Sequence, residues 1–288
     1  MNGGSNNIHL NEIEQKEQCR MKYLKDAVYG FAVGDALGVP FEFKKRGSFS
    51  CSGMIGGGTW SEPAGTWSDD TSMLLATMDS IRACGCIDPD DMMQRFLRWY
   101  RDADYTCNGD VFDIGMTTRS AIQRFADGVP SFLCGASDER SNGNGSLMRI
   151  LPLAFTAATD EEINTISALT HAHDLSLLCC RQYVAVARHL LEHGEMPKEW
   201  TERMRSTPME AIRSTGYVLD SLTAAIWCMV NTENYEQAVL TAVNLGEDTD
   251  TIGALTGGLA GILYGIGDIP EDWLQTLRNP SAIDNCLF

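Results

Sequence analysis

Residues 246–265, GEDTDTIGALTGGLAGILYG, decide the fold of this chain. The first part crowds carboxylates and hydroxyls together, and the rest is apolar with a glycine at every fourth position. A spacing of four places these glycines on one face of a helix. The glycines are Gly253, Gly257, Gly261 and Gly265. The stretch therefore predicts a helix that begins at an acidic cluster and packs closely against a neighbouring backbone.

A second glycine pattern lies near the start of the chain, at Gly30, Gly34 and Gly38, within a predicted helix over 21–38. An interior glycine costs a helix about 0.5–1 kcal/mol relative to alanine, unless close packing requires it. Small residues at this spacing also occur in membrane helices, but the adjacent aspartates exclude that interpretation here. We expect the two glycine faces to be buried in helix packing near the functional site.

The remainder of the chain also reads as helical, because strand-like alternation is almost absent. Residues 43–67 are rich in Gly, Ser and Thr and predict an irregular loop. Helical patterns cover 70–81, 90–101, 115–126, 146–157, 160–170, 174–193, 208–213, 217–230, 234–244 and 251–266. The fold class is therefore all-α, a compact bundle of many helices. We expect a flexible N-terminal tail over 1–20 and a single domain over 21–288.

Composition limits the kinds of protein this chain can be. Its 288 residues are 44% hydrophobic, enough for a sizeable core, and its net charge is −17. Nucleic-acid binding is not expected, because it requires clustered lysine and arginine. The ten cysteines contain no Cys-x-x-Cys pair, and we find no signal peptide and no run of about 18 apolar residues. We expect a cytoplasmic protein that does not span a membrane.

The acidic cluster at 248–251 has a counterpart far earlier in the chain, Ser68-Asp69-Asp70-Thr71. Each cluster precedes a predicted helix. Helix capping would explain one or two residues of either cluster, but it does not explain two clusters of similar chemistry. Carboxylate and hydroxyl oxygens are the ligands that hard divalent ions prefer. If folding joins the clusters, they form an oxygen-lined pocket suited to two Mg²⁺ or Mn²⁺ ions.

Other metal motifs fail on spacing. An EF-hand loop beginning at Asp248 lacks the oxygen ligand at Ile252 and the final glutamate, where Leu259 stands. An Asp-Asp-x-x-Asp motif fails because Met73 occupies its last position. His173-Asp174 resembles the centre of an HD phosphohydrolase, but the upstream histidine that such a fold requires has no suitable candidate.

Four further features are candidates for the site. Glu42 follows the first predicted helix and is either a site acid or a solvated one. Asp113 lies between apolar residues and could instead cap the helix after it. The loop 141–146, SNGNGS, leads into a predicted helix start, where free N–H groups bind anions such as a diphosphate, although Asn-Gly is also common in turns. His171 lies at a helix junction and is either a ligand contact or a core histidine.

Taken together, these segments resemble the ADP-ribosylglycohydrolase family. Six matching segments occur in the family's order and span most of the chain: Gly30–Glu42, Gly65–Thr71, Phe112–Gly115, Gly143–Leu151, Thr170–His173 and Gly246–Gly258. The Phe-Asp-Ile-Gly and Gly-Asn-Gly-Ser-Leu-Met-Arg segments are most similar to the dinitrogenase-reductase-activating type, which acts on ADP-ribosylated arginine.

The resemblance implies a fold with a two-metal site at helix termini. One metal would be bound by Ser68, Asp69 and Asp70, and the other by Asp248, Asp250 and Thr251, with Asp250 shared. Many relatives have threonine where Ser68 stands, and the hydroxyl is retained. The catalytic acids would be Glu42, Asp69, Asp113 and Asp250. The substrate would be held by Asn142, Gly143, Asn144, Gly145, Ser146 and His171.

The activity implied is hydrolysis of the N-glycosidic bond that joins ADP-ribose to an arginine side chain. The partners would be an ADP-ribosylated protein and free ADP-ribose. The alternatives are hydrolysis of serine-linked, polymeric or nucleobase-linked ADP-ribose, or a protein that binds ADP-ribose without catalysis. A further alternative is an immunity protein whose partner is a toxin, because the segment 1–20 has no counterpart in the family.

Overall fold

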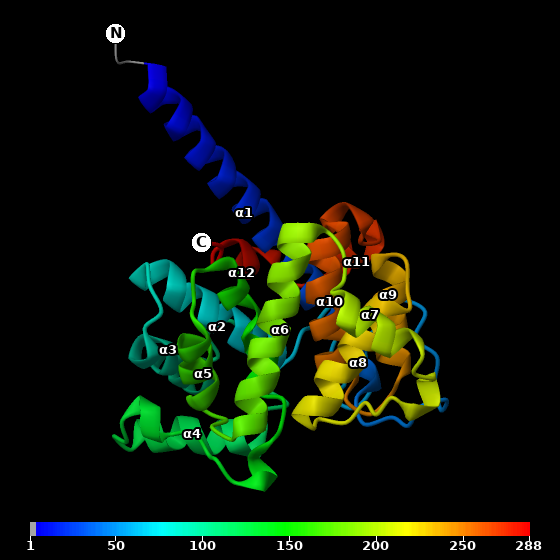
Figure 1. Cartoon of the computed structure of the whole chain (residues 1–288). Helices are drawn as coiled ribbons and strands as arrows, with labels where there is room; N and C mark the ends of the chain where they lie inside the picture. The colour runs from blue at the N-terminus through cyan, green and yellow to red at the C-terminus, as the bar shows by residue number, and fades with distance from the viewer. Residues whose placement is uncertain (1–3) are drawn as a thin grey trace.

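The structure, a computed structural model, describes residues 4–288, with side chains described from residue 18 onward. Twelve α-helices cover most of this part of the chain (Figure 1). They are α1 (Gly4–Gly38), α2 (Asp69–Cys84), α3 (Pro89–Asp102), α4 (Met116–Ala126), α5 (Asp160–Ala168), α6 (Asp174–His193), α7 (Lys198–Arg205), α8 (Val218–Val230), α9 (Tyr235–Asn244), α10 (Thr249–Tyr264), α11 (Glu271–Thr276) and α12 (Pro280–Asp284).

Short 3-10 helices occupy several of the connections: η1 (Val39–Phe41), η2 (Ser131–Leu133), η3 (Glu139–Ser141), η4 (Leu147–Arg149), η5 (Leu151–Phe155), η6 (Met209–Ala211) and η7 (Ile266–Asp268). Extended pairing within residues 4–288 is limited to three isolated bridges. The predicted all-α fold is therefore confirmed. Among the described residues, no helix combines the length and the apolar character needed to cross a membrane.

The pair α1 and α10 forms the centre of the molecule, with α8 and α9 packed against α10. A Cβ atom on Gly34 would lie 2.1 Å from the Gly253 carbonyl oxygen, and one on Gly257 would lie 2.2 Å from the Gly30 carbonyl oxygen. The backbones therefore meet at these glycines, as the sequence predicts. Gly265 is the exception, because it lies just beyond α10 at φ 78° and ends the helix.

Two predicted elements differ in the structure. The pattern over 146–157 predicts one helix, but the chain forms η4 and η5 there. Pro152 lacks the N–H that a continuous α-helix would require in its interior. A three-residue 3-10 helix also has little dipole, so the predicted anion-binding helix start is absent from this loop.

The N-terminal segment also differs from the predicted tail over 1–20. Residues 1–3 lie outside the described residues, but α1 already begins at Gly4. Figure 1 shows the first part of α1 standing clear of the other helices. Residues 8–21 contain no glycine or proline and many strong helix formers, which explains the extension. The flexibility of this segment and the division into one tail and one domain stay predictions.

Candidate active site

The start of α2 is held in place by a buried carboxylate of α1. The two oxygens of Asp35 accept hydrogen bonds from the Ser68 backbone N–H at 2.9 Å, the Thr71 N–H at 3.0 Å and the Thr71 hydroxyl at 2.6 Å. Ser68 caps the helix, and its Oγ accepts from the Asp70 N–H at 3.2 Å. These bonds place Asp69 and Asp70 in the first turn of α2, both buried.

The start of α10 meets this turn from the other side. The Thr251 hydroxyl donates to Asp70 Oδ2 at 3.2 Å. A Cβ on Gly38 would lie 2.3 Å from the Asp250 Cα, so the end of α1 lies directly against the acidic turn of α10. Asp248 precedes α10 without capping it by its side chain, and its Oδ2 accepts from the Asn144 amide at 2.7 Å. The fold therefore brings the two predicted acidic clusters together.

Glu42 and Asp113 join the acidic turns. One carboxylate oxygen from each of Glu42, Asp113 and Asp250 lies within 4.8 Å of the others. The indole N–H of Trp60 donates to Glu42. Asp113 has φ 63°, a left-handed conformation that is uncommon for aspartate. Asp113 does not cap α4, whose N-cap is Gly115, so the capping interpretation of Asp113 is wrong.

Burial and crowding raise the pKa of each carboxyl group in the acidic cluster, which comprises Glu42, Asp69, Asp70, Asp113, Asp248 and Asp250. Burial, with repulsion from Asp248 adding to it, raises the pKa of Glu42 to about 7, although the Trp60 hydrogen bond opposes the shift. Burial and repulsion from Asp69 and Glu42 raise the pKa of Asp113 to about 11. The pKa values of Asp69, Asp70 and Asp250 are raised well above the usual range, first by burial and then by neighbouring carboxylates. Carboxylates this close do not all ionise unless a cation neutralises them.

The donor atoms fit a hard divalent cation. Asp70 Oδ1 and Asp250 Oδ2 are fully buried, and neither has a hydrogen-bond partner among the described residues. An orphaned buried carboxylate oxygen costs free energy, which a bound cation would offset. The two acidic helix starts offer carboxylate oxygens together with the hydroxyl oxygens of Ser68 and Thr251, the kind of donor that Mg²⁺ and Mn²⁺ prefer.

Five acidic residues line a cavity of about 410 Å³, namely Glu42, Asp69, Asp70, Asp113 and Asp248, whereas Asp250 and Ser68 lie outside its lining. Four of the six residues predicted to hold the substrate also line this cavity and are called the substrate wall: Gly143, Asn144, Gly145 and His171. The structure turns the other two away from the cavity. The side-chain amide oxygen of Asn142 accepts a hydrogen bond from the Ser176 hydroxyl at 3.0 Å. The fully buried Ser146 hydroxyl accepts one from the Ser167 hydroxyl at 2.9 Å. Asn142 and Ser146 are thus in positions that support the loop rather than contact a ligand.

Several residues of the site were missed by sequence reasoning. Asp35 was not among the predicted site residues, although a carboxylate on an apolar, Gly-rich helix face requires a partner; the structure shows that it supports α2. Phe43 and Met116 lie at the cavity with 66% and 89% of their surface exposed. Within the described part of the chain, Arg140 is the one lysine or arginine that lines the cavity. No pattern in the sequence singles out these three side chains, because Phe43 lies on a loop, Met116 begins α4 and Arg140 lies in the short η3.

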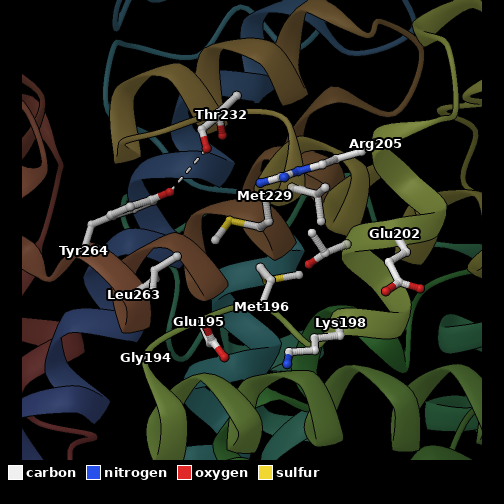
Figure 2. A pocket seen from close by; sticks show the side chains of 12 residues that line it. Gly194, Glu195, Met196, Lys198, Glu202, Arg205, Met229, Thr232, Leu263 and Tyr264 are labelled. Atoms are coloured by element: carbon white, nitrogen blue, oxygen red, sulfur yellow. Dashed lines mark hydrogen bonds between the residues drawn. The ribbon is translucent and has the colours of Figure 1, made fainter.

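A second hollow lies between the end of α6, α7 and the C-terminal ends of α8 and α10 (Figure 2). It carries exposed charges of both signs, among them Lys198, Glu202 and Arg205. None of the buried polar atoms that lack a hydrogen bond in the described chain lines it. Polar groups therefore converge at the acidic cavity rather than at this second hollow.

The fold and the acidic cavity define a helical protein with a site whose oxygen donors suit divalent cations. The chain belongs to the ADP-ribosylglycohydrolase family, whose model matches residues 20–287.

Known relatives agree with this assignment. The chain is 33% identical over 281 residues to the "ADP-ribosylarginine hydrolase Tri1" of Serratia proteamaculans, covering 91% of this chain and 76% of that protein. It is 32% identical over 270 residues to the "ADP-ribosyl-[dinitrogen reductase] glycohydrolase" of Rhodospirillum rubrum, covering 87% and 88%. A solved structure described as an "ADP-ribosylglycohydrolase-related protein complex" is similar with a TM-score of 0.79 and 32% identity, covering 94% of this chain and 97% of that one.

Proposed function

We propose that this protein is a hydrolase that removes ADP-ribose from modified arginine side chains. Two relatives with the name ADP-ribosylarginine hydrolase, from Serratia proteamaculans and Pseudomonas putida, are 33% and 36% identical to this chain. The observation that carries the proposal is that Glu42 and Asp113 line one cavity while an Asp250 carboxylate oxygen lies within 4.8 Å of theirs. Carboxylates are the best partners for a planar, permanently charged guanidinium.

In the reaction, water adds to C1″ of the distal ribose, the C–N bond breaks and the departing guanidine nitrogen takes a proton. Asp113 would supply that proton, and the burial and repulsion that raise its pKa favour the protonated carboxyl. Glu42 would accept a proton from the attacking water, because a carboxylate whose pKa is raised toward neutrality is a stronger base than an ordinary glutamate. Its Oε2 already accepts from Trp60, which fixes the orientation of the carboxylate.

Two Mg²⁺ or Mn²⁺ ions would be held by the ligand sets Ser68, Asp69 and Asp70, and Asp248, Asp250 and Thr251. When bound, they would supply Lewis-acid polarisation and a lowered pKa for water. The Glu42, Asp113 and Asp250 group is an alternative cation position. Asp69 and Asp250 would also orient the ribose hydroxyls. The wall formed by Gly143, Asn144, Gly145 and His171 would hold the ribose and the diphosphate.

The experiment is incubation of the protein with arginine-linked, serine-linked and DNA-linked ADP-ribose, each with Mg²⁺ and with EDTA. We expect ADP-ribose to be released from the arginine linkage in the presence of Mg²⁺ and not in the presence of EDTA. Preference for the serine linkage would contradict the proposed specificity and leave the site intact. Binding of ADP-ribose without release from any linkage would identify a non-catalytic binding protein.

We further propose that the protein works in the cytoplasm, in keeping with ten cysteines that form no disulfide. An ADP-ribosylated protein would be its macromolecular partner. If the chain is an immunity protein, its partner would be a toxin. This remains a prediction, and it concerns the first part of α1.

A further inference from the structure

Arg149, at the end of η4, is a fully buried charge without an acidic neighbour to pair with among its hydrogen-bond partners. Its Nη2 donates to the Ile166 carbonyl at 3.1 Å and to the Thr170 hydroxyl at 2.8 Å. The guanidinium lies 4.7 Å from the centre of the Phe96 ring. Nε and Nη1 have no partner within the described residues. Burial of a charge without an acidic partner is costly. Residues that break this rule are found at functional sites.

Thr170 connects this arginine to the cavity. Its side chain is fully buried, and its Oγ lies 2.8 Å from His171 Nδ1. Because Arg149 has only donors, it consumes a lone pair of the Thr170 oxygen and leaves the hydroxyl proton free. Among the described residues, His171 Nδ1 is the one hydrogen-bond partner left for that proton. A protonated Nδ1 would leave the buried hydroxyl proton without an acceptor.

The Nε2 side of the His171 ring faces Gly143 and Gly145. Nε2 lies 3.6 Å from the point where a Cβ on Gly143 would stand, and no described group forms a hydrogen bond with it. A Cβ on Gly145 would lie 2.8 Å from His171 Cε1, so the glycine leaves room for the ring. His171 stays neutral, because burial and then the charge of Arg149 lower its pKa to about 3. The backbone of His171 is fixed by the Ser167 carbonyl, which accepts from its N–H at 2.9 Å.

We propose that Arg149 is a positioning residue that acts through Thr170 to fix His171 as the tautomer with its proton on Nε2. This N–H then points at the cavity and donates to an acceptor oxygen of bound ADP-ribose. The tautomer follows from the structure of the free protein, whereas the contact with ADP-ribose rests on the proposed function. Arg149 itself touches no ligand.

The tautomer is measured directly in the free protein by ¹⁵N NMR of the histidine side chains. The chain contains five histidines, and a His171→Gln variant identifies the signals of His171 by their loss. We expect a bare Nδ1 and a protonated Nε2 at neutral pH. A proton on Nδ1, or a charged ring at that pH, would overturn the proposal without any further variant.

Matched variants test the roles of Thr170 and Arg149. Thr170→Val removes the hydroxyl at nearly constant volume, and Arg149→Met removes its donor. In both, we expect mixed tautomers and an affinity for ADP-ribose, measured by calorimetry, weaker by about three- to tenfold. Thr170→Ser keeps the hydroxyl and should keep the wild-type tautomer and affinity. Unchanged spectra and affinity in Thr170→Val or in Arg149→Met would overturn the relay.

Catalysis provides a separate readout. With ADP-ribosyl-arginine, Thr170→Val should raise KM more than it lowers kcat, because the contact is made in the ground state as well. An equal fall in kcat at constant KM would contradict this part. If the wild type hydrolyses no linkage, the proposed function fails, while the tautomer of His171 and the affinity for ADP-ribose still decide the relay.

Discussion

The two acidic helix starts look alike in sequence but are supported in different ways. The start of α2 is held by hydrogen bonds, since the buried Asp35 accepts two backbone N–H groups and one hydroxyl there. The start of α10 lies in backbone contact with Gly38, and hydrogen bonds add to this contact, since the Thr249 hydroxyl donates to the Gly38 carbonyl at 2.8 Å and the Asn144 amide donates to Asp248. Similar ligand chemistry therefore reaches one site through a polar support at α2 and through a steric support combined with hydrogen bonds at α10.

The largest expected effect comes from removing a charge on either side. Asp70→Asn and Asp250→Asn should each lower kcat on ADP-ribosyl-arginine by about a thousandfold or more, because each removes a carboxylate from the proposed cation site. The shape of the side chain is retained, so circular dichroism should show an unchanged helix content. Near-wild-type turnover in either variant would separate the two helix starts functionally and contradict a joint site.

The steric support is tested by Gly38→Ala. The new Cβ would meet the backbone of Asp250 and Thr249, so the end of α1 must move away from α10. Overpacking of this kind should lower the free energy of unfolding by about 3 kcal/mol, as measured by urea denaturation. Gly267→Ala is the matched control, since a Cβ there meets no atom within 4 Å. Equal stability of the two variants would show that close contact at Gly38 is unimportant.

The polar support is tested by pH in the absence of metal. Burial raises the pKa of Asp35 from 3.8 to about 6 and that of Glu42 from 4.5 to about 7. Below about pH 3 both carboxyls are protonated in the folded and the unfolded chain. As pH rises toward 7, the unfolded chain releases these protons while the folded chain retains them, so stability falls.

We expect the metal-free protein to lose on the order of 2 kcal/mol between pH 5 and pH 8, measured by urea denaturation in EDTA. Added Mg²⁺ should restore most of this loss, because a cation stabilises the ionised carboxylates. Stability that rises with pH in EDTA would contradict the raised pKa values.

The smallest effect is expected for Asn144→Ala. The variant removes the amide that donates to Asp248 Oδ2 and to Ser221 Oγ. Loss of such a support should weaken Mn²⁺ affinity by about tenfold, measured by calorimetry, and change stability by about 1 kcal/mol. Unchanged affinity would show that Asp248 is positioned by its backbone bond to Ser214 alone.

Sequence reasoning succeeded where a local pattern reports on packing. The four-residue glycine spacing predicted that each glycine face packs closely against another backbone, because interior glycines otherwise cost a helix stability, and the structure shows that the two faces meet each other. The paired acidic clusters predicted a shared cavity, and Thr251 indeed donates to Asp70 there. Their roles as metal ligands remain predictions.

Features that depend on tertiary contacts could not be predicted. The pattern over 146–157 is a different case, because Pro152 is visible in the sequence and argues against one continuous helix; the chain forms η4 and η5 there. Ser146 looked like a loop hydroxyl available to a ligand, but the fold buries it against Ser167. Asp113 is predicted as a site acid with a helix cap as the alternative, but no sequence pattern indicates the left-handed backbone with which it joins the acidic cluster.

The central claim, that the starts of α2 and α10 form one cation site, is tested most directly by anomalous diffraction from crystals grown with Mn²⁺. We expect two manganese peaks in the cavity, one beside Asp70 and one beside Asp250, with oxygen ligands throughout. The absence of peaks there at saturating Mn²⁺, or an ion bound by histidine or cysteine elsewhere, would contradict the account.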